Sequence, residues 1–551
     1  MNGYFTVKNL LTRLLVTGGL LLGSLEPMCG QVAHVAPHPK LVVGIVIDQM
    51  RWDYLYRYAG LYTTGGFRRL MEQGFRCENT LLPYVPSYTG PGHTCIYTGS
   101  VPALHGIIAN DWYDESSGKN IYCTQDDSVS TIGSDSPEGR MSPRNLWVTT
   151  IGDELRLSNN FQSRVIGISL KDRASILPAG HSANAAYWYD GTAGKWITSS
   201  YYMQALPAWV DSENARHLPD QYMSRDWNTL LPPSAYVQST PDAEPYEGTI
   251  GGEPSPVFPH RLSTYRNRYE AFRYTPFAMT YTFDMARAAV VHEHLGRGAV
   301  TDLLAISISP TDYVGHTFGP NSMEAEDTYL RLDRDIAGFL AFLDRQLGAG
   351  NYLLFLTADH GVLQVPGFLK DHNIPSGNYS TSALKSSLNG MIGAKYHLDN
   401  GIAAVENNQV YISPRLLRDS ERLPGIERDI VDFLRQQPFV ADAFLTSGIL
   451  TASIPEPVRD RLVNGYTPRR SGQVGFYELP GYLAGGSKGT THGSWNPYDA
   501  HIPLIWFGYH ITPGQTSRET YMTDIAATLA AMLHIQVPDG CVGHVIGELI
   551  K

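Results

Sequence analysis

The chain has 551 residues, with 42 Lys and Arg against 53 Asp and Glu, which gives a net charge of −11. This acidic balance argues against a protein that binds nucleic acid through a basic patch, because such proteins carry a surplus of positive charge. With 43% hydrophobic and 17% charged residues, the composition is that of a globular protein that can bury a large core.

The first 30 residues have the pattern of an export signal. Lys8 and Arg13 precede an apolar run, 14–25, that is shorter than the roughly 20 residues a membrane-spanning helix needs. We therefore expect cleavage between residues 30 and 36, a periplasmic or secreted protein, and no membrane anchor in the mature form. A buried N-terminal helix is the alternative.

Removal of the signal leaves four cysteines in the mature chain. They are Cys77, Cys95, Cys123 and Cys541. An oxidising compartment permits two disulfide bonds, but four cysteines allow three pairings and the sequence does not choose among them. None of them has the C-x-x-C spacing that is typical of a zinc–thiolate site.

Five short apolar runs have the composition of strands that are buried on both faces of a parallel sheet. They cover residues 41–47, 165–170, 303–309, 352–356 and 502–507. Helical stretches lie between them, and we expect helices at 142–157, 280–295 and 325–347. Strands that alternate with helices predict an α/β fold with a doubly wound, mostly parallel central sheet.

Two segments do not follow this alternation. Residues from about 183 to 279 are rich in Tyr, Trp and Pro, and residues from about 362 to 485 separate the fourth strand from the fifth. We interpret both as insertions into one catalytic domain, 38–551, and expect them to cover the C-terminal edge of the sheet. The second is predicted to be an α+β unit with a strand near 409–412 and a helix near 426–435.

Aromatic residues in the first of these segments have two possible roles. The run Tyr187-Trp188-Tyr189 is expected to pack inside the protein, since aromatic runs are more often core than ligand platform. Stacking on an aromatic leaving group is the alternative.

Ionisable residues follow four of the five predicted strands. The first strand ends at Asp48 and the second at Lys171, while the third leads to Asp312 and the fourth to Asp359-His360. Ligands of an open parallel sheet bind at the C-terminal edge of its strands. One such Asp could simply cap a helix, but four strands with this ending predict an active site.

Three Asp and three His form a candidate set of metal ligands. The set consists of Asp48, Asp312, His316, Asp359, His360 and His492. Mixed oxygen and nitrogen ligands without thiolates suit zinc, and six protein ligands can serve two ions. Two ions about 4 Å apart are suited to in-line displacement at phosphorus.

Such a site needs a hydroxyl or water as nucleophile, and residues 84–110 offer a candidate. Thr89 precedes Gly90-Pro91-Gly92, where a loop is predicted to turn into a helix. A hydroxyl at a helix N-terminus lies near exposed backbone N–H groups that can hold anionic oxygens. Simple N-capping is the alternative role of Thr89, and Ser87 is the competing nucleophile.

A series of motifs carries a resemblance to a known family. In chain order they are P-x-x-T, G-H, T-G, P-x-x-H-G-x-x-x-N, P-T-D-x-x-G-H, A-D-H-G and T-H-G. With this pattern, the chain resembles the alkaline phosphatase superfamily in its nucleotide pyrophosphatase/phosphodiesterase-like branch. It is most similar to the periplasmic, threonine-nucleophile alkaline phosphatases of the PafA type, over residues 41–546.

The resemblance implies a pairing of the ligands. Asp312, His316 and His492 would hold one zinc ion, and Asp48, Asp359 and His360 would hold the other together with Thr89. Thr89 would attack phosphorus and form a phosphothreonine that is then hydrolysed.

Lys171 and Arg173 bear on the choice between monoesters and diesters. A monoester dianion carries more charge than a diester and favours additional donors and cations around its free oxygens. If the chain stays extended after the second strand, both side chains lie on one face; a solvated strand exit is the alternative. The resemblance implies that Asn110, Lys171 and Arg173 bind phosphate in the monoesterases, whereas diesterases of the other branch lack this Lys and Arg.

The sequence therefore predicts a secreted, metal-dependent alkaline phosphatase with two zinc ions per chain. It is expected to act as a monomer on small phosphate monoesters, with some phosphodiesterase activity. A nucleotide pyrophosphatase/phosphodiesterase that acts mainly on diesters is the alternative.

Overall fold

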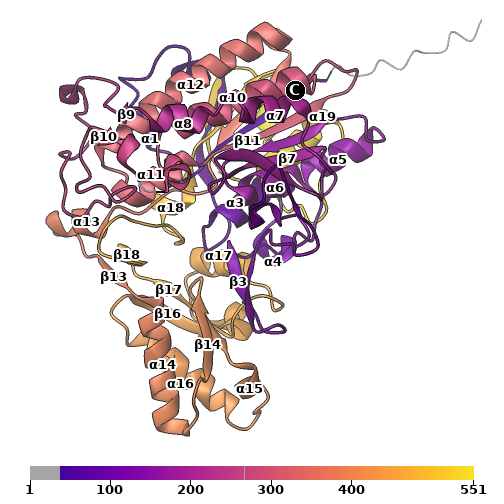
Figure 1. The fold of residues 1–551 in the computed structure, drawn as a ribbon. Helices are drawn as coiled ribbons and strands as arrows, with labels where there is room; N and C mark the ends of the chain where they lie inside the picture. Colours follow the sequence, from indigo (N-terminus) through magenta and orange to yellow (C-terminus); the bar gives the residue numbers. More distant parts are fainter. Residues whose placement is uncertain (1–37, 266, 551) are drawn as a thin grey trace, which may run out of the picture. The chain divides into compact units, whose positions relative to one another are not determined.

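A mixed sheet of eleven strands lies at the centre of residues 39–551 (Figure 1). The computed structural model describes residues 38–265 and 267–550, so the predicted export signal lies outside the described residues. The order of the sheet is β19-β2-β20-β12-β1-β11-β6-β7-β8-β5, and β21 pairs with β2. Three of its outer strands are β2 (Phe75–Leu81), β5 (Thr131–Ile132) and β21 (Gly514–Tyr521). The α/β prediction is confirmed.

Four predicted strands are parallel neighbours in the middle of this sheet. They are β12 (Tyr352–Thr357), β1 (Leu41–Ile47), β11 (Asp302–Ile308) and β6 (Val165–Ile168). All their side chains are buried, as expected for strands that are covered on both faces. The C-terminal ends of all four therefore meet at one edge.

Two long helices pack beside these strands. α10 spans Phe277–His292, and α12 spans Met323–Leu347 with Ile336, Phe339 and Leu343 fully buried. Both lie within a few residues of the predicted helices. The Ser322 hydroxyl, which accepts a hydrogen bond from the Ala325 backbone N–H at 3.1 Å, sets the start of α12.

The prediction of a mostly parallel sheet is confirmed only in part, and the predicted strand at 502–507 is divided. The run 502–507 is broken at Pro503 into β19 (His501–Ile502) and β20 (Leu504–Gly508), because proline has no N–H to donate to a neighbouring strand. β20 pairs antiparallel with β12, so the sheet is mixed.

The helix predicted at 142–157 begins nine residues later. α5 spans Ile151–Ser158. Thr150 and Asp153 form a capping box, in which each side chain accepts from the backbone N–H of the other. The Ser142 hydroxyl instead donates to Asp126 at 2.5 Å, which holds it in an irregular segment.

The first predicted insertion contains part of the central sheet. β7 (Ala185–Asp190) runs parallel to β6, and β8 (Lys195–Ser199) continues antiparallel beside it. Tyr187, Trp188 and Tyr189 are at most 1% exposed, which excludes stacking on a leaving group. An aromatic run buried on both faces of a sheet gives no alternating pattern, which explains the misassignment.

The second predicted insertion has a hydrophobic core of its own, drawn in orange in Figure 1. Its sheet has the order β14 (Ile402–Glu406), β15 (Gln409–Ile412), β17 (Val474–Glu478) and β16 (Val440–Leu445). The helices α14 (Thr381–Tyr396) and α16 (Leu423–Arg435) contribute Leu388, Ile392, Ile430 and Leu434 to this core. The predicted strand has the bounds of β15, and the predicted helix lies within α16.

Helix α17 (Glu456–Gly465) connects the second insertion to the segment around residue 83 through hydrogen bonds. Asn464 Nδ2 donates to the Pro83 carbonyl at 2.8 Å, and Arg461 Nε donates to the Leu82 carbonyl at 3.1 Å. The Val85 N–H donates to the Arg461 carbonyl at 3.1 Å. The segment that leads to Thr89 is therefore held by the insertion.

The cysteines of the described residues, Cys77, Cys95, Cys123 and Cys541, are free thiols, and the first three are buried. Among the helices that the structure describes, none combines the length and the apolar character that a membrane crossing requires.

Candidate active site

The ends of the four parallel strands bring together the ionisable residues that follow them. Lys171 Nζ lies 2.7 Å from Asp48 Oδ2 and 2.5 Å from Asp312 Oδ2. Asp312 lies in α11 (Pro310–Phe318), directly after β11, and all three residues are at most 3% exposed. The cation and the two carboxylates thus form one buried cluster.

Three imidazoles complete this cluster, and all three are oriented in the same way. Each directs Nδ1 to a backbone carbonyl: His316 to Thr490 at 2.8 Å, His360 to Gly361 at 3.0 Å and His492 to Ser87 at 2.6 Å. A carbonyl can only accept, so each neutral ring carries its proton on Nδ1. The Nε2 lone pairs are left for a metal ion.

The Nε2 atoms face the carboxylates. His316 and His492 lie 3.1 Å and 3.7 Å from Asp312 Oδ1, whereas His360 lies 3.4 Å from Asp359 Oδ2 and 3.6 Å from Asp48 Oδ1. Two groups have ligand atoms within 4.8 Å of one another: Asp48 with Asp359 and His360, and Asp312 with His360 and His492.

The first group equals one ligand set implied by the resemblance. The second shares Asp312 and His492 with the other implied set but contains His360 in place of His316. His316 contacts this second group through Asp312. The rings of His360 and His492 are stacked, with their centroids 3.5 Å apart.

Three buried polar atoms of this cluster have no hydrogen-bond partner among the described residues. They are Asp48 Oδ1, Asp359 Oδ2 and His360 Nε2. Buried acceptors that converge without donors are costly unless a cation satisfies them. The residues present therefore fit a metal site.

The electrostatics of Asp48 and His492 agree with metal binding, whereas the pKa of His316 is raised because the effect of burial is outweighed by Asp312. Burial, together with the nearby charge of Asp359, raises the pKa of Asp48 well above its ordinary value. Burial, together with His360 and His316, lowers the pKa of His492 well below its ordinary value. A neutral imidazole is the form that binds a metal, and a carboxylate that resists ionisation alone is stabilised by an added cation.

Lys171 keeps its positive charge inside this cluster. Burial acts to lower its pKa, but Asp312 and Asp48 outweigh burial and raise the pKa of Lys171 above its ordinary value. A permanent cation therefore lies between the two carboxylates.

Thr89 is the first residue of helix α3 (Thr89–Thr98) and is 1% exposed. The Gly90 backbone N–H donates to Asn110 Oδ1 at 2.8 Å, which brings Asn110 next to the predicted nucleophile. A Cβ at Gly92 would lie 2.6 Å from the Asp359 carbonyl oxygen, so this glycine permits the start of α3 to approach Asp359.

Ser87 has a different environment. Its hydroxyl donates to the Ser494 carbonyl at 3.0 Å and accepts from the Gly493 N–H at 3.1 Å. Both partners belong to the loop that carries His492. The hydroxyl of Ser87 is thus occupied in fixing that loop.

The chain does not stay extended past Lys171, which was the condition for placing Lys171 and Arg173 on one face of a strand. Lys171 is the N-cap of helix α6 (Asp172–Ala179), so Arg173 lies in the first turn of this helix. Arg173 Nη1 donates to the Tyr122 hydroxyl at 2.9 Å, and its buried Nε has no partner among the described residues. The helix begins here because Asp172 at its first position favours a helix N-terminus.

Two further residues of the site were not predicted. Gln49 donates from its backbone N–H to Asp359 Oδ1 at 3.1 Å and from Nε2 to Asp312 Oδ1 at 2.6 Å. His93 Nδ1 lies 3.2 Å from Asp359 Oδ2, and its Nε2 lies 2.9 Å from the Ser307 hydroxyl. The sequence offered one signal for each residue: Gln49 lies next to Asp48, and His93 belongs to the G-H motif. Neither signal identifies the partners, because both side chains contact residues more than 200 positions away.

Comparisons with known proteins identify the family of the chain. The family model of type I phosphodiesterase / nucleotide pyrophosphatase matches residues 42–434. Alkaline phosphatase PhoV of Synechococcus elongatus is 48% identical over 514 residues, which cover 93% of each chain. Alkaline phosphatase PafA of Elizabethkingia meningoseptica is 46% identical over 550 residues, which cover 99% of each chain.

A solved structure is similar over nearly the same range. The crystal structure of wild-type alkaline phosphatase PafA matches with a TM-score of 0.91 at 47% identity, covering 94% of this chain and 99% of that one.

Proposed function

The chain belongs to the type I phosphodiesterase and nucleotide pyrophosphatase family, and from this premise we propose how its site hydrolyses phosphate esters. It is a metal-dependent alkaline phosphatase, a hydrolase of phosphate monoesters, since relatives 46% and 48% identical over nearly the full chain carry that name. The alternative of an enzyme acting mainly on diesters is less supported.

The observation that carries the proposal is the common orientation of His316, His360 and His492. With every Nδ1 bound to a carbonyl, the Nε2 atoms and the carboxylates form a preorganised cation site. We infer that Asp312, His316 and His492 hold one zinc ion and that Asp48, Asp359 and His360 hold a second. When bound, the ions supply positive charge for the phosphoryl oxygens.

Thr89 is the proposed nucleophile. Its Oγ1 gives up its proton to water and forms a bond to phosphorus while the bond to the ester oxygen breaks. The departing oxygen takes up a proton from water, so the net transfer is of the Thr89 proton to the leaving alcohol. Water then attacks the phosphothreonine, which releases inorganic phosphate and restores the hydroxyl. The buried position of Thr89 at the start of α3 supports this role, as does the use of Ser87 elsewhere.

Asn110, Lys171 and Arg173 are proposed to bind the remaining phosphate oxygens. The bond from Gly90 to Asn110 Oδ1 leaves the Nδ2 protons of the same amide directed away from Gly90. Lys171 is a buried cation, and Arg173 has a buried Nε that a phosphate oxygen can satisfy. Two cations around these oxygens favour a monoester dianion over a diester.

The test compares p-nitrophenyl phosphate with bis-p-nitrophenyl phosphate. We expect faster hydrolysis of the monoester, loss of activity after chelation, and recovery with Zn²⁺. Replacing both Lys171 and Arg173 with Ala should lower monoester kcat/KM by about a hundredfold or more, and diester kcat/KM far less, because charged hydrogen bonds are lost.

Exchange of the exposed Lys395 for Ala is the matched control and should change neither rate. No hydrolysis of either substrate by metal-replete protein would contradict the enzyme assignment. Equal losses on both substrates in the double variant would mean that Lys171 and Arg173 only support the fold.

The predicted export signal further leads us to propose that the enzyme acts outside the cytoplasm.

A further inference from the structure

One residue, Asp499, contacts both of the loops that carry His360 and His492. Asp499 lies in the short helix α18 (Pro497–Ala500) and is 1% exposed. Its backbone carbonyl accepts a hydrogen bond from the N–H of Gly361, the residue after His360, at 2.7 Å. The backbone of Asp499 is therefore fixed against the loop of His360.

The side chain of Asp499 holds the other loop. Its Oδ2 accepts from the backbone N–H groups of Gly493 at 3.1 Å and Ser494 at 2.8 Å, the two residues after His492. The other carboxylate oxygen, Oδ1, is buried and has no partner among the described residues. Burial of a carboxylate is costly, and the two N–H groups of the His492 loop are the contacts that offset this cost.

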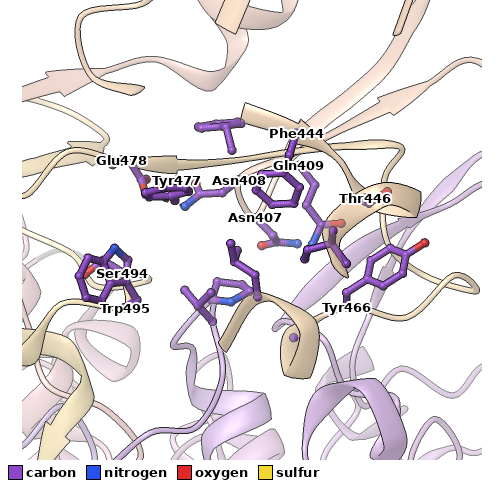
Figure 2. A pocket seen from close by; sticks show the side chains of 17 residues that line it. Asn407, Asn408, Gln409, Phe444, Thr446, Tyr466, Tyr477, Glu478, Ser494 and Trp495 are labelled. Atoms are coloured by element: carbon purple, nitrogen blue, oxygen red, sulfur yellow. Dashed lines mark hydrogen bonds between the residues drawn. The ribbon is translucent and has the colours of Figure 1, made fainter. Parts of the chain in front are cut away.

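Packing alone does not fix the His492 loop, because the loop borders two cavities. A crevice with a volume of about 30 Å³ is lined by Ser494 together with Phe444 and Tyr477 of the insertion sheet (Figure 2). A second hollow, of about 100 Å³, is lined by His492 itself and by Asp499. Side chains beside a void lack contacts that would otherwise hold them. The loop therefore depends for a fixed position on its hydrogen bonds, including those to Asp499.

The position of this loop determines the geometry of the proposed metal ligands. The ring of His492 is stacked on that of His360, although the two are proposed to bind different zinc ions. Movement of the loop would shift His492 Nε2, which lies 3.7 Å from Asp312 Oδ1. Zinc holds its nitrogen and oxygen ligands at about 2.0–2.2 Å, so a displaced imidazole weakens the site.

We propose that Asp499 is a positioning residue that fixes the His492 loop against the His360 loop and thereby sets the geometry of the zinc site that contains His492. The side chain acts on that site alone, because the Gly361 N–H donates to a backbone carbonyl that every substitution of Asp499 retains. This inference rests on the proposed function, since it assigns His360 and His492 to different zinc ions.

Zinc affinity tests this role without turnover. Metal-free protein would be titrated with Zn²⁺ against a competing chelator, and His492→Ala would identify which of the two binding steps belongs to its site. Asp499→Ala should weaken that step by about tenfold or more and leave the other unchanged, since outer partners of metal ligands contribute on this order. Asp499→Asn, whose carbonyl oxygen can accept from the same two N–H groups, should retain both affinities.

Asp190→Ala is the matched control. Asp190 is also buried, and its Oδ1 accepts from two consecutive backbone N–H groups, those of Thr192 at 2.8 Å and Ala193 at 3.0 Å. Its loop carries no proposed metal ligand, so this variant should lose thermal stability but keep both zinc affinities. Asp499→Leu, whose side chain branches at the same atom but has no acceptor, replaces the alanine variant if that one does not fold.

An equal weakening of both binding steps in Asp499→Ala or Asp499→Leu, or no change in either step, would overturn the proposal. An equal loss in Asp499→Asn and Asp499→Ala would also overturn it, because the charge rather than the two hydrogen bonds would then be responsible. If p-nitrophenyl phosphate were hydrolysed but the zinc affinities did not respond, only the role of Asp499 would be refuted. A selective loss at the His492 site in a protein that hydrolyses neither p-nitrophenyl ester would refute only the proposed function.

Discussion

At the scale of single residues, catalysis is proposed to depend on the Thr89 hydroxyl. Thr89→Ala removes the atom that forms the bond to phosphorus, so we expect no phosphoenzyme and a fall in kcat of at least about a thousandfold. Acid quenching with labelled substrate would measure the phosphoenzyme. Thr89→Ser, which keeps a hydroxyl, should retain both properties in part.

Near-wild-type turnover of Thr89→Ala would contradict this role and would point to Ser87 or to direct attack by water. The hydrogen bonds of Ser87 to Gly493 and Ser494 give a separate expectation for that residue. Removal of the Ser87 hydroxyl should make the loop that carries His492 less rigid.

Gln49 is a positioning residue that links a carboxylate of each proposed zinc site. Its backbone N–H donates to Asp359 and its side-chain Nε2 donates to Asp312, and the side chain is buried. Gln49→Ala removes only the bond to Asp312. Gln49→Ala should weaken metal binding by roughly 10–100-fold, because partners that orient metal ligands contribute on this order. Titration against a competing chelator would measure the loss.

Gln221→Ala, on an exposed side chain, serves as the control for Gln49 and should leave metal affinity unchanged. Unaltered retention of zinc by Gln49→Ala would show that the hydrogen bond from Gln49 Nε2 does not position Asp312. Asp48, Lys171 and Asp312 could be predicted from the sequence because each follows a strand. The role of Gln49 could not be predicted from the sequence, because its partners Asp359 and Asp312 come close to it only when three strands pair in the sheet.

At the scale of elements, helix α17 positions the segment that leads to Thr89. Gly465 closes this helix against the loop, where an added Cβ would lie 1.8 Å from the Val85 carbonyl oxygen. Gly465→Ala should therefore destabilise the protein by about 1–3 kcal/mol, as overpacked sites do, and lower kcat/KM by displacing the loop. Thermal unfolding and steady-state kinetics would measure the two effects.

Gly390→Ala, in α14, is a matched control because a Cβ there meets no atom within 4 Å. It should leave kcat/KM unchanged and stabilise the helix by up to about 1 kcal/mol. Equal stability of the two variants would mean that the contact between α17 and Val85 is easily relaxed.

The elements were predictable where burial leaves a pattern in the sequence. β1, β11 and β12 appear as continuous apolar runs because both faces of each strand are covered. β7 escaped prediction because the buried run Tyr187-Trp188-Tyr189 shows no alternating pattern, and only pairing with β6 identifies it as a strand. Pro503 was visible in the sequence, but the antiparallel pairing of β20 with β12 was not.

At the scale of the whole molecule, the net charge of −11 does not describe the active site. Asp48, Asp312 and Asp359 contribute to that charge, yet they are buried around Lys171 and around the proposed metal ions. The net charge of the chain therefore argues against a basic patch that binds nucleic acid, but it allows a locally positive site that binds a phosphate dianion.

Buried carboxyl groups outside the active site predict how the stability of the whole protein changes with pH. Glu247 is 1% exposed, and its Oε2 has no partner among the described residues. Burial, with the nearby charge of Glu324, raises the pKa of Glu247 to about 9. The unfolded chain releases this proton near its ordinary pKa of 4.5, whereas the folded protein retains it.

Above pH 4.5 the unfolded state is therefore favoured progressively, and this destabilisation is complete only as the pH reaches about 9. Glu247→Gln has no proton to lose, so it should raise the melting temperature relative to wild type by several degrees at pH 8.5 and hardly at pH 4.5. Melting curves of both proteins across this range would measure the difference. A constant difference at all pH values would mean that Glu247 is ionised in the folded protein and that its burial is compensated by another charge.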